Sequence, residues 1–360
     1  MCRCLKRNGF YVDIVFLVNF IISFTLAFLI SWTVTFYIRK WAIAKRMLDK
    51  PNERSSHKRI TPLGGGVAIV VSWYLCVVLL AIFCPEMMPV RLFAALLPGI
   101  LLALVGIRDD VKQMSPWTRL IVQLVSVGLS LFILGGVNEI DFGTFTWNCP
   151  VVINLLVFLL LVWFVNLFNF YDGIDGNLGS EAIAISLMSV MLIPNSPLIL
   201  FVACVGGFLV WNWQKAKIFM GDAGSTFIGF VFGVFAVYFQ DWPSDGSHMP
   251  IPLILWVLIC IVAIFDTTFT LLRRIVYKEN VLKPHKNQLF QRLVLSGFSH
   301  QQTVFVQQGM NLIVAAGVWF VFHNKEYMLP VVLGFVAFFC VYAYWVERRY
   351  PFVRQNKVEE

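Results

Sequence analysis

Long apolar runs alternate with short polar segments along the whole chain. A helix of about 20 apolar residues crosses a hydrocarbon core of about 30 Å, and most of the runs approach that length. We therefore predict an all-α polytopic membrane protein of about eleven transmembrane helices. The predicted spans are 14–38, 64–84, 92–107, 120–137, 151–170, 182–193, 197–213, 224–240, 252–272, 303–323 and 328–346. The span 182–193 is short, so a tilted helix and a re-entrant turn both fit it.

Composition and charge agree with one integral membrane domain over residues 1–360. The chain is 59% hydrophobic and only 13% charged, which excludes two or three soluble domains. Of its 28 Lys and Arg residues, 23 fall on one side if the N-terminus lies outside. This asymmetry predicts that the C-terminus is cytoplasmic. The net charge of +8 therefore reports orientation, and we expect no binding to nucleic acid. The predicted inside loops are 39–63, 108–119, 171–181, 214–223 and 273–302.

Five aspartates lie at the inside ends of predicted spans. Asp109 and Asp110 close the third span, Asp172 and Asp175 follow the fifth, and Asp222 precedes the eighth. Carboxylates near lipid are costly, and such residues commonly mark functional sites. The charge count did not use these residues, so their common side is an independent indication of a cytoplasmic site.

Two of these acidic motifs suggest specific chemistry. In NLFNFYDGIDG, residues Asn166, Asn169, Asp172 and Asp175 recur every three positions and share a helix stripe while the helix lasts. A polar helix end with a glycine cap is the alternative for this loop alone. In GDAGS, small residues permit close approach of an anion, and Asp222 suits Mg²⁺. Because Mg²⁺ takes one or two carboxylates plus phosphate oxygens, a diphosphate substrate follows.

Basic residues in two other inside loops could neutralise those phosphates. Lys58 and Arg59 lie in the first loop, and His285 and Arg292 lie in the last. The alternative is a basic surface attracted to anionic lipid.

Asp266 is the one acidic residue within a predicted span. Arg273 follows seven positions later on the same helix face, so we predict a structural ion pair between them.

Taken together, these motifs resemble the bacterial polyprenyl-phosphate N-acetylhexosamine-1-phosphate transferases, relatives of the phospho-MurNAc-pentapeptide translocase. The resemblance covers nearly the whole chain and is closest to members that start O-antigen or related surface glycans. The matching strings are PNERSSHKRITPLGGG, Asp109–Asp110, NxxNxxDGIDG, FMGDAGS and PHKNQLFQRL, in the family's order.

The resemblance implies a reaction and a membrane. A UDP-activated N-acetylated sugar and undecaprenyl phosphate would give undecaprenyl diphosphate-sugar and UMP, with Mg²⁺ or alternatively Mn²⁺. The protein would lie in the bacterial cytoplasmic (inner) membrane with its site facing the cytoplasm. The donor sugar and the oligomeric state stay open, a homodimer being one option.

The resemblance also implies roles for individual positions. Asp109 is the expected base, with Asp110 supporting it, and His285 is a further catalytic candidate. Gln288 stands where a second histidine is common, which puts a shared histidine role in doubt. The expected metal ligands are Asp222 and Asn169. The expected substrate contacts are Phe219 near uracil, Asp175 at the nucleoside, Arg119 near the diphosphate, and Asp172, Arg59, Lys58 and Arg292.

The ionisation state of the acceptor phosphate reduces the need for a catalytic base. A lipid phosphate is mostly dianionic at pH 7, and an ordinary aspartate is a weak base. We therefore expect Asp109 and Asp110 mainly to position the cation and the acceptor, and to be unequal because adjacent helical side chains point about 100° apart. A covalent aspartyl-phosphate route stays open.

A transporter of an anionic solute is the alternative function. Transporters place ionisable residues near the bilayer midplane, whereas these lie at one surface.

Overall fold

The computed structural model describes residues 9–51, 59–194, 196–240, 251–281, 283 and 285–354, with backbone only for 9–16. The chain is a bundle of helices with two short hairpins. The helices are α1 Gly9–Ala44, α2 Gly66–Phe83, α3 Val90–Leu96, α4 Gly99–Val111, α5 Pro116–Leu134, α6 Pro150–Tyr171, α7 Asn177–Leu192, α8 Leu198–Asn212, α9 Asp222–Gln240, α10 Leu253–Ile259, α11 Ile261–Val276, α12 Leu289–Leu295, α13 His300–His323, the 3₁₀ helix η2 Lys325–Tyr327, and α14 Met328–Arg349.

Each of the eleven predicted spans is helical. By length and composition, eight helical segments in the described part of the chain are long enough to cross a membrane. The pair α10 and α11 would add a ninth, and α7 and α8 are shorter apolar helices. This confirms an all-α polytopic membrane protein. The predicted span 182–193 belongs to α7, which begins five residues earlier at Asn177.

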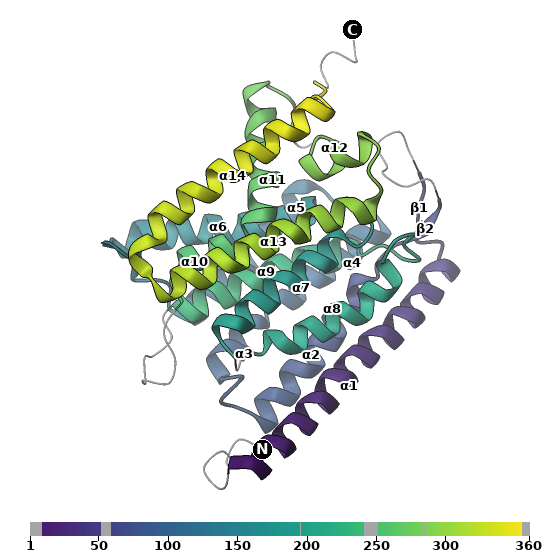
Figure 1. Cartoon of the computed structure of the whole chain (residues 1–360). Coiled ribbons are helices and arrows are strands. Elements are labelled where there is room, and N and C mark those ends of the chain that lie inside the picture. The colour runs from purple at the N-terminus through teal and green to yellow at the C-terminus, as the bar shows by residue number, and fades with distance from the viewer. Residues whose placement is uncertain are drawn as a thin grey trace.

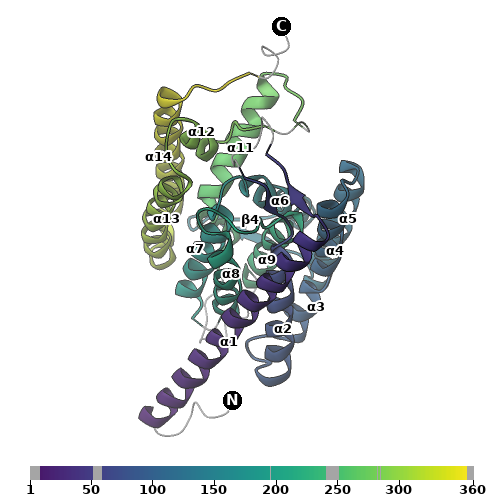
Figure 2. The same cartoon turned by 90° about the vertical axis from the view of Figure 1, so that its right-hand side faces the viewer.

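Two predicted spans are interrupted. Pro98 separates α3 from α4 because it lacks an N–H donor for a helical hydrogen bond, although Leu97 and Pro98 both keep right-handed helical backbone angles. At Cys260 the chain turns by 80° between α10 and α11. As a result α11 projects beyond the bundle at the end where the C-terminus lies (Figures 1 and 2).

Helix α9 is the buried centre of the bundle, and small residues bring its neighbours close. A Cβ added to Gly106 of α4 would lie 2.4 Å from the Cα of Ala223 in α9, and one added to Gly66 of α2 would lie 2.3 Å from the Cα of Gly224. Membrane helices pack through such small residues, since apolar burial gives little drive in lipid. The end of α4 and the start of α2 therefore meet the first turn of α9.

The two antiparallel hairpins lie between helices. Strands β1 (Leu48–Asp49) and β2 (Thr61–Pro62) pair Leu48 with Pro62, and they flank the end of the bundle where α4 ends (Figure 1). Strands β3 (Glu139–Asp141) and β4 (Thr146–Asn148) connect α5 to α6.

Candidate active site

The predicted acidic loops meet at one end of the bundle. Asp110 lies near the end of α4, and its Oδ1 accepts a hydrogen bond of 2.9 Å from the backbone N–H of Asp222, the first residue of α9. Gly221 precedes it with a φ of +78°, and a Cβ there would come within 2.4 Å of Asp110 Oδ2. Only glycine suits this combination of a left-handed backbone and close approach. The α4–α9 packing thus joins residues 112 positions apart.

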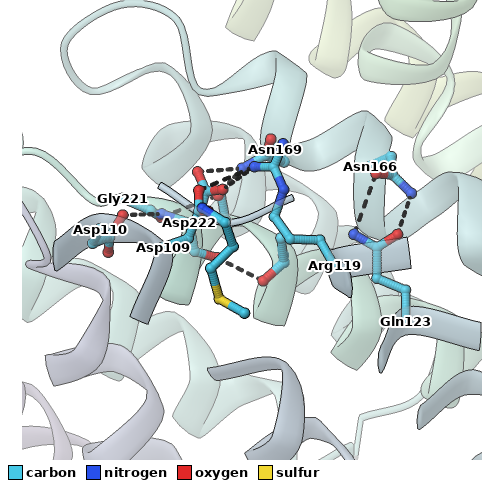
Figure 3. A network of polar contacts seen from close by, with 11 residues as sticks. Asp109, Asp110, Arg119, Gln123, Asn166, Asn169, Gly221 and Asp222 are labelled. Carbon is cyan, nitrogen blue, oxygen red and sulfur yellow. Dashed lines mark hydrogen bonds and ion pairs between the residues drawn. The ribbon is translucent and has the colours of Figure 1, made fainter. Parts of the chain in front are cut away.

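Arg119 lies between two of the carboxylates (Figure 3). Its Nη1 is 3.1 Å from Asp109 Oδ2 and 2.9 Å from Asp222 Oδ2. Asp109 also accepts a hydrogen bond of 2.6 Å from the N–H of Met114. The adjacent aspartates therefore face different partners, as expected from helix geometry. Asp110 Oδ2 is buried and accepts no hydrogen bond from the described residues.

Helix α6 supplies an amide to the same cluster. Asn169 Nδ2 donates to Asp222 Oδ1 and to Ser225 Oγ, at 2.9 Å in both cases. Asn166, one turn earlier, instead pairs with Gln123 of α5 (Figure 3). The predicted stripe of polar side chains ends after Asn169, because α6 stops at Tyr171, before Asp172 and Asp175.

Asp172 follows the end of α6, and its carboxylate makes no hydrogen bond to another described residue. Burial, reinforced by the nearby carboxylates of Asp222 and Asp110, raises the pKa of Asp172 to about 7. This carboxyl therefore exchanges a proton near neutral pH. Asp172 was expected to contact substrate, and its environment also permits proton transfer.

The first loop reaches the site through its backbone. The N–H of Phe219 donates to the carbonyl of Pro62, and the N–H of Gly65 donates to the carbonyl of Phe219, both at 2.8 Å. The half-buried Phe219 therefore lies between β2 and Asp222. Arg59 is exposed two residues before β2. Lys58 lies outside the described residues.

Asp175 has hydrogen-bond partners that the sequence pattern did not suggest, and its charge helps to raise the pKa of the nearby Asp172. Its Oδ2 accepts a hydrogen bond of 3.1 Å from the N–H of Ala216, and its own N–H donates to His300 Nδ1 at 3.2 Å. Asn212 accepts from the N–H of Gly176 and donates to the carbonyl of Ile218, each at 3.0 Å. His300 and Asn212 carried no local motif, so only the fold reveals them.

The last inside loop has a different character. His285 Nδ1 accepts a hydrogen bond from the N–H of Asn287, and burial together with the positive charge of Arg274 lowers the pKa of His285 to about 4. Gln288 donates to the carbonyl of Phe170 at 2.9 Å. The described hydrogen bonds of His285 and Gln288 are thus made to other residues of the protein.

Arg292 is 1% exposed and bonds Glu347 and the carbonyl of Tyr350. Nε and Nη2 of Arg292 thus bond to other parts of the protein, and its predicted contact with substrate stays a prediction.

The predicted pair between Asp266 and Arg273 is wrong. Asp266, 2% exposed, accepts hydrogen bonds from the N–H groups of Leu289 and Phe290 at the start of α12, at 2.7 and 3.0 Å. Arg273 instead pairs with Glu347 at 2.6 Å. A helix start has free N–H donors, and these satisfy the buried carboxylate.

The donor set at Asp222 suits a divalent cation. Carboxylate oxygens of Asp109 and Asp222 converge on one Arg119 nitrogen, and Asp110 has a buried oxygen with no hydrogen-bond partner among the described residues. Among the described residues, no three His, Cys, Asp or Glu side chains form a set of metal ligands by themselves. Mg²⁺ commonly needs only one or two, since substrate phosphates and water complete its shell.

Comparison with known proteins agrees with the resemblance noted in the sequence. The sequence model of glycosyl transferase family 4 matches residues 92–240, the region that carries Asp109, Asp110, Arg119, Asn169 and Asp222. Over these residues the chain is similar to glycosyl transferase family 4.

Several relatives agree with this similarity. A Bacillus subtilis (strain 168) protein named probable undecaprenyl-phosphate N-acetylglucosaminyl 1-phosphate transferase is 28% identical, over 81% of each chain. A Mycolicibacterium smegmatis protein named decaprenyl-phosphate N-acetylglucosaminephosphotransferase is 29% identical, over 76% of this chain and 74% of its own. An Escherichia coli (strain K12) protein named undecaprenyl-phosphate alpha-N-acetylglucosaminyl 1-phosphate transferase is 25% identical, over 89% of each.

Proposed function

We propose that this protein transfers an N-acetylated sugar-1-phosphate from a UDP-sugar to undecaprenyl phosphate, releasing UMP. This is the first membrane step of O-antigen or related cell-envelope glycan synthesis. The observation that carries the proposal is the convergence of Asp109, Asp110 and Asp222 with Arg119, from three separate helices, at one end of a membrane bundle. The named activities of the relatives supply the substrate classes.

The reaction exchanges one phosphoanhydride bond for another. An oxygen of the acceptor phosphate attacks the phosphorus that carries the sugar, and the bond from that phosphorus to the bridging oxygen of UMP breaks. Both partners are anionic, so the site has to offset their repulsion. Arg119 provides a positive charge at the cluster, and Arg59 is exposed in the first loop.

Asp222, aided by Asn169, would hold Mg²⁺. When bound, the ion supplies Lewis-acid stabilisation of charge on the diphosphate. The direct bond from the Asp222 N–H holds the Asp110 carboxylate against the first turn of α9, which also carries the Asp222 side chain.

Asp109 suits a positioning role. Both of its oxygens accept hydrogen bonds, one from the N–H of Met114 and one from Arg119, which hold the carboxylate in place. Asp172, with a pKa raised to about 7 by burial and nearby carboxylates, is the group outside the helices whose proton affinity suits general base catalysis.

The orientation follows from charge. The 23 Lys and Arg residues predicted on the same side as the acidic loops support an orientation in which this end of the bundle faces the cytoplasm from a bacterial inner membrane. UDP-sugar would then enter from the cytosol, and the lipid acceptor from the surrounding leaflet.

The test uses membranes that contain the protein, incubated with undecaprenyl phosphate and a panel of labelled UDP-N-acetylated sugars, with and without EDTA. We expect labelled lipid and an equal amount of UMP with at least one sugar, both abolished by EDTA and restored by Mg²⁺. Metal-independent uptake of an anionic solute without lipid labelling would overturn the proposal in favour of a transporter.

A further inference from the structure

The turn that carries Asp175 is clamped to two other parts of the chain. Asp175 Oδ2 accepts from the N–H of Ala216, which ties the turn to the segment before Phe219. His300 Nδ1 accepts from the N–H of Asp175 and lies 3.5 Å from Asp175 Oδ2. Both side chains are largely buried, at 11% exposed for Asp175 and 14% for His300. Asp175 Oδ1 accepts no hydrogen bond from another described residue, so it is open to a donor from a ligand.

The start of α13 holds His300 in place. Ser299 caps the helix: its Oγ accepts from the N–H of Gln302 at 3.1 Å, and Gln302 Oε1 accepts from the N–H of Ser299 at 2.8 Å. This reciprocal capping box defines where the helix begins. His300 is therefore the first helical residue, and its ring projects from a well-defined helix end.

Further contacts align α13 with the polypeptide on both sides of the Asp175 turn. Gln307 donates to the hydroxyl of Tyr171 at 2.6 Å, and Asn311 donates to Glu181 at 2.7 Å. Tyr171 ends α6 before the turn, and Glu181 lies in α7 after it. All four side chains of these bonds are buried. The position of His300 is thus coupled to the turn at three levels along α13.

The polar contacts of the Asp175 turn also fix its position relative to the segment that carries Phe219. Asn212, 3% exposed, bridges the N–H of Gly176 and the carbonyl of Ile218, the residue before Phe219. An aromatic ring and an open carboxylate oxygen are thereby held on two segments joined by three polar contacts. A ring to stack on and an acceptor for N–H or O–H are what a uridine moiety needs.

We propose that His300 is a positioning residue for the uridine nucleotide: by accepting the N–H of Asp175 it holds the turn so that Asp175 Oδ1 faces a donor group of the nucleotide. The inference rests on the proposed function, because that function supplies the uridine ligand. It adds a residue that lies outside the region matched by the family and outside every motif noted in the sequence.

The matched variants differ in whether they keep the acceptor. In His300→Asn, the side-chain oxygen on Cγ replaces Nδ1 as a hydrogen-bond acceptor. His300→Leu removes the acceptor and keeps a side chain of similar size. His323→Leu, at the opposite end of the same helix, is the control. Two measurements are made on purified full-length protein in detergent with Mg²⁺. One is equilibrium binding of UMP, and the other is initial rates with each substrate varied separately.

We expect His300→Leu to raise the Kd for UMP and the KM for UDP-sugar by about threefold to tenfold, the effect of one lost hydrogen bond. The kcat and the KM for undecaprenyl phosphate should change by less than about twofold, and His300→Asn should restore UMP binding to within about twofold of wild type. The control should match wild type throughout.

Other outcomes overturn the inference in distinguishable ways. Unchanged UMP binding in His300→Leu, or equal losses in the Leu and Asn variants, would reject His300 as a positioning residue while sugar transfer by wild type still upholds the function. Wild type that binds UMP but transfers no sugar would reject the function, and the UMP comparison would still decide the role of His300. Wild type that binds no UMP would reject both.

Discussion

The site end of α4 and α9 and the segment from α11 to α14 were both expected to carry catalytic residues, yet their polar groups are used differently. Around Asp222, side chains from α4, α5 and α6 converge, and the buried Asp110 Oδ2 accepts no hydrogen bond from the part of the chain that the structure describes. Arg292, by contrast, donates hydrogen bonds to other residues of the protein, Glu347 and Tyr350. Charge in a loop therefore does not identify a site. Unsatisfied acceptors that converge from distant segments are the better sign.

The largest expected effect is at the centre of the acidic cluster. Asp222→Asn removes the charge that faces Arg119 and weakens metal binding, so transfer should fall by about 10²- to 10³-fold. UMP release and lipid labelling measure it. The matched control is Asp141→Asn, which alters a carboxylate paired with Lys325 near the β3–β4 hairpin. If Asp222→Asn and Asp141→Asn lost transfer activity equally, the acidic cluster would not differ from a carboxylate outside it.

In the other region, the loss should appear in stability. Arg292→Met leaves Glu347 without one of its two arginine partners and should lower the free energy of unfolding by about 3–5 kcal/mol. Thermal unfolding in detergent measures this, and KM for both substrates should stay near wild type in the protein that remains folded. Arg348→Met, an exposed arginine on the same helix as Glu347, serves as the control. A large rise in the KM of Arg292→Met for UDP-sugar would instead support the predicted contact of Arg292 with substrate.

A smaller effect tests the close packing at the site. Gly221→Ala places a methyl group against Asp110 in a left-handed backbone conformation, which costs about 1–2 kcal/mol and displaces the carboxylate. Transfer should fall about tenfold. Gly309→Ala, within α13 where an added Cβ meets nothing within 4 Å, should keep full activity. Equal activity of the two variants would show that the Asp110 position is not critical.

The smallest effect concerns His285. Its pKa in the folded protein is lowered to about 4 by burial, below the ordinary value near 6.5. The stability from the neutral ring is complete above about pH 6.5 and is lost as the pH falls toward 4. His285→Asn should therefore flatten the loss of thermal stability between these pH values, and the shape of the activity profile from pH 6 to 8 should not change. A midpoint in that profile that disappears in the variant would show His285 acting as an acid or base.

Much of the architecture was predictable because backbone hydrogen bonds in lipid have to be made within each span. The meeting of the three acidic motifs was predictable for a related reason. Carboxylates such as Asp110, Asp172 and Asp222 avoid lipid, so they cluster at span ends on one side of the membrane. The proline break at residue 98 had a local signal, whereas the bend at Cys260 had none.

The partners of individual side chains were not predictable. Asp266 and Arg273 share a helix face, and yet each found a partner outside that helix. The N–H groups of α12 and the carboxylate of Glu347 were better matches, because they lie closer in the folded chain. His300 likewise meets Asp175 across 125 positions.

The amino-acid pattern alone determined that this chain is a bundle of apolar helices with acidic residues at span ends, since both follow from the cost of exposing polar groups to hydrocarbon. Only the tertiary structure decided which carboxylates stay open and which are satisfied. That choice depends on close helix contacts, such as Gly106 against Ala223, that bring distant donors and acceptors within bonding distance.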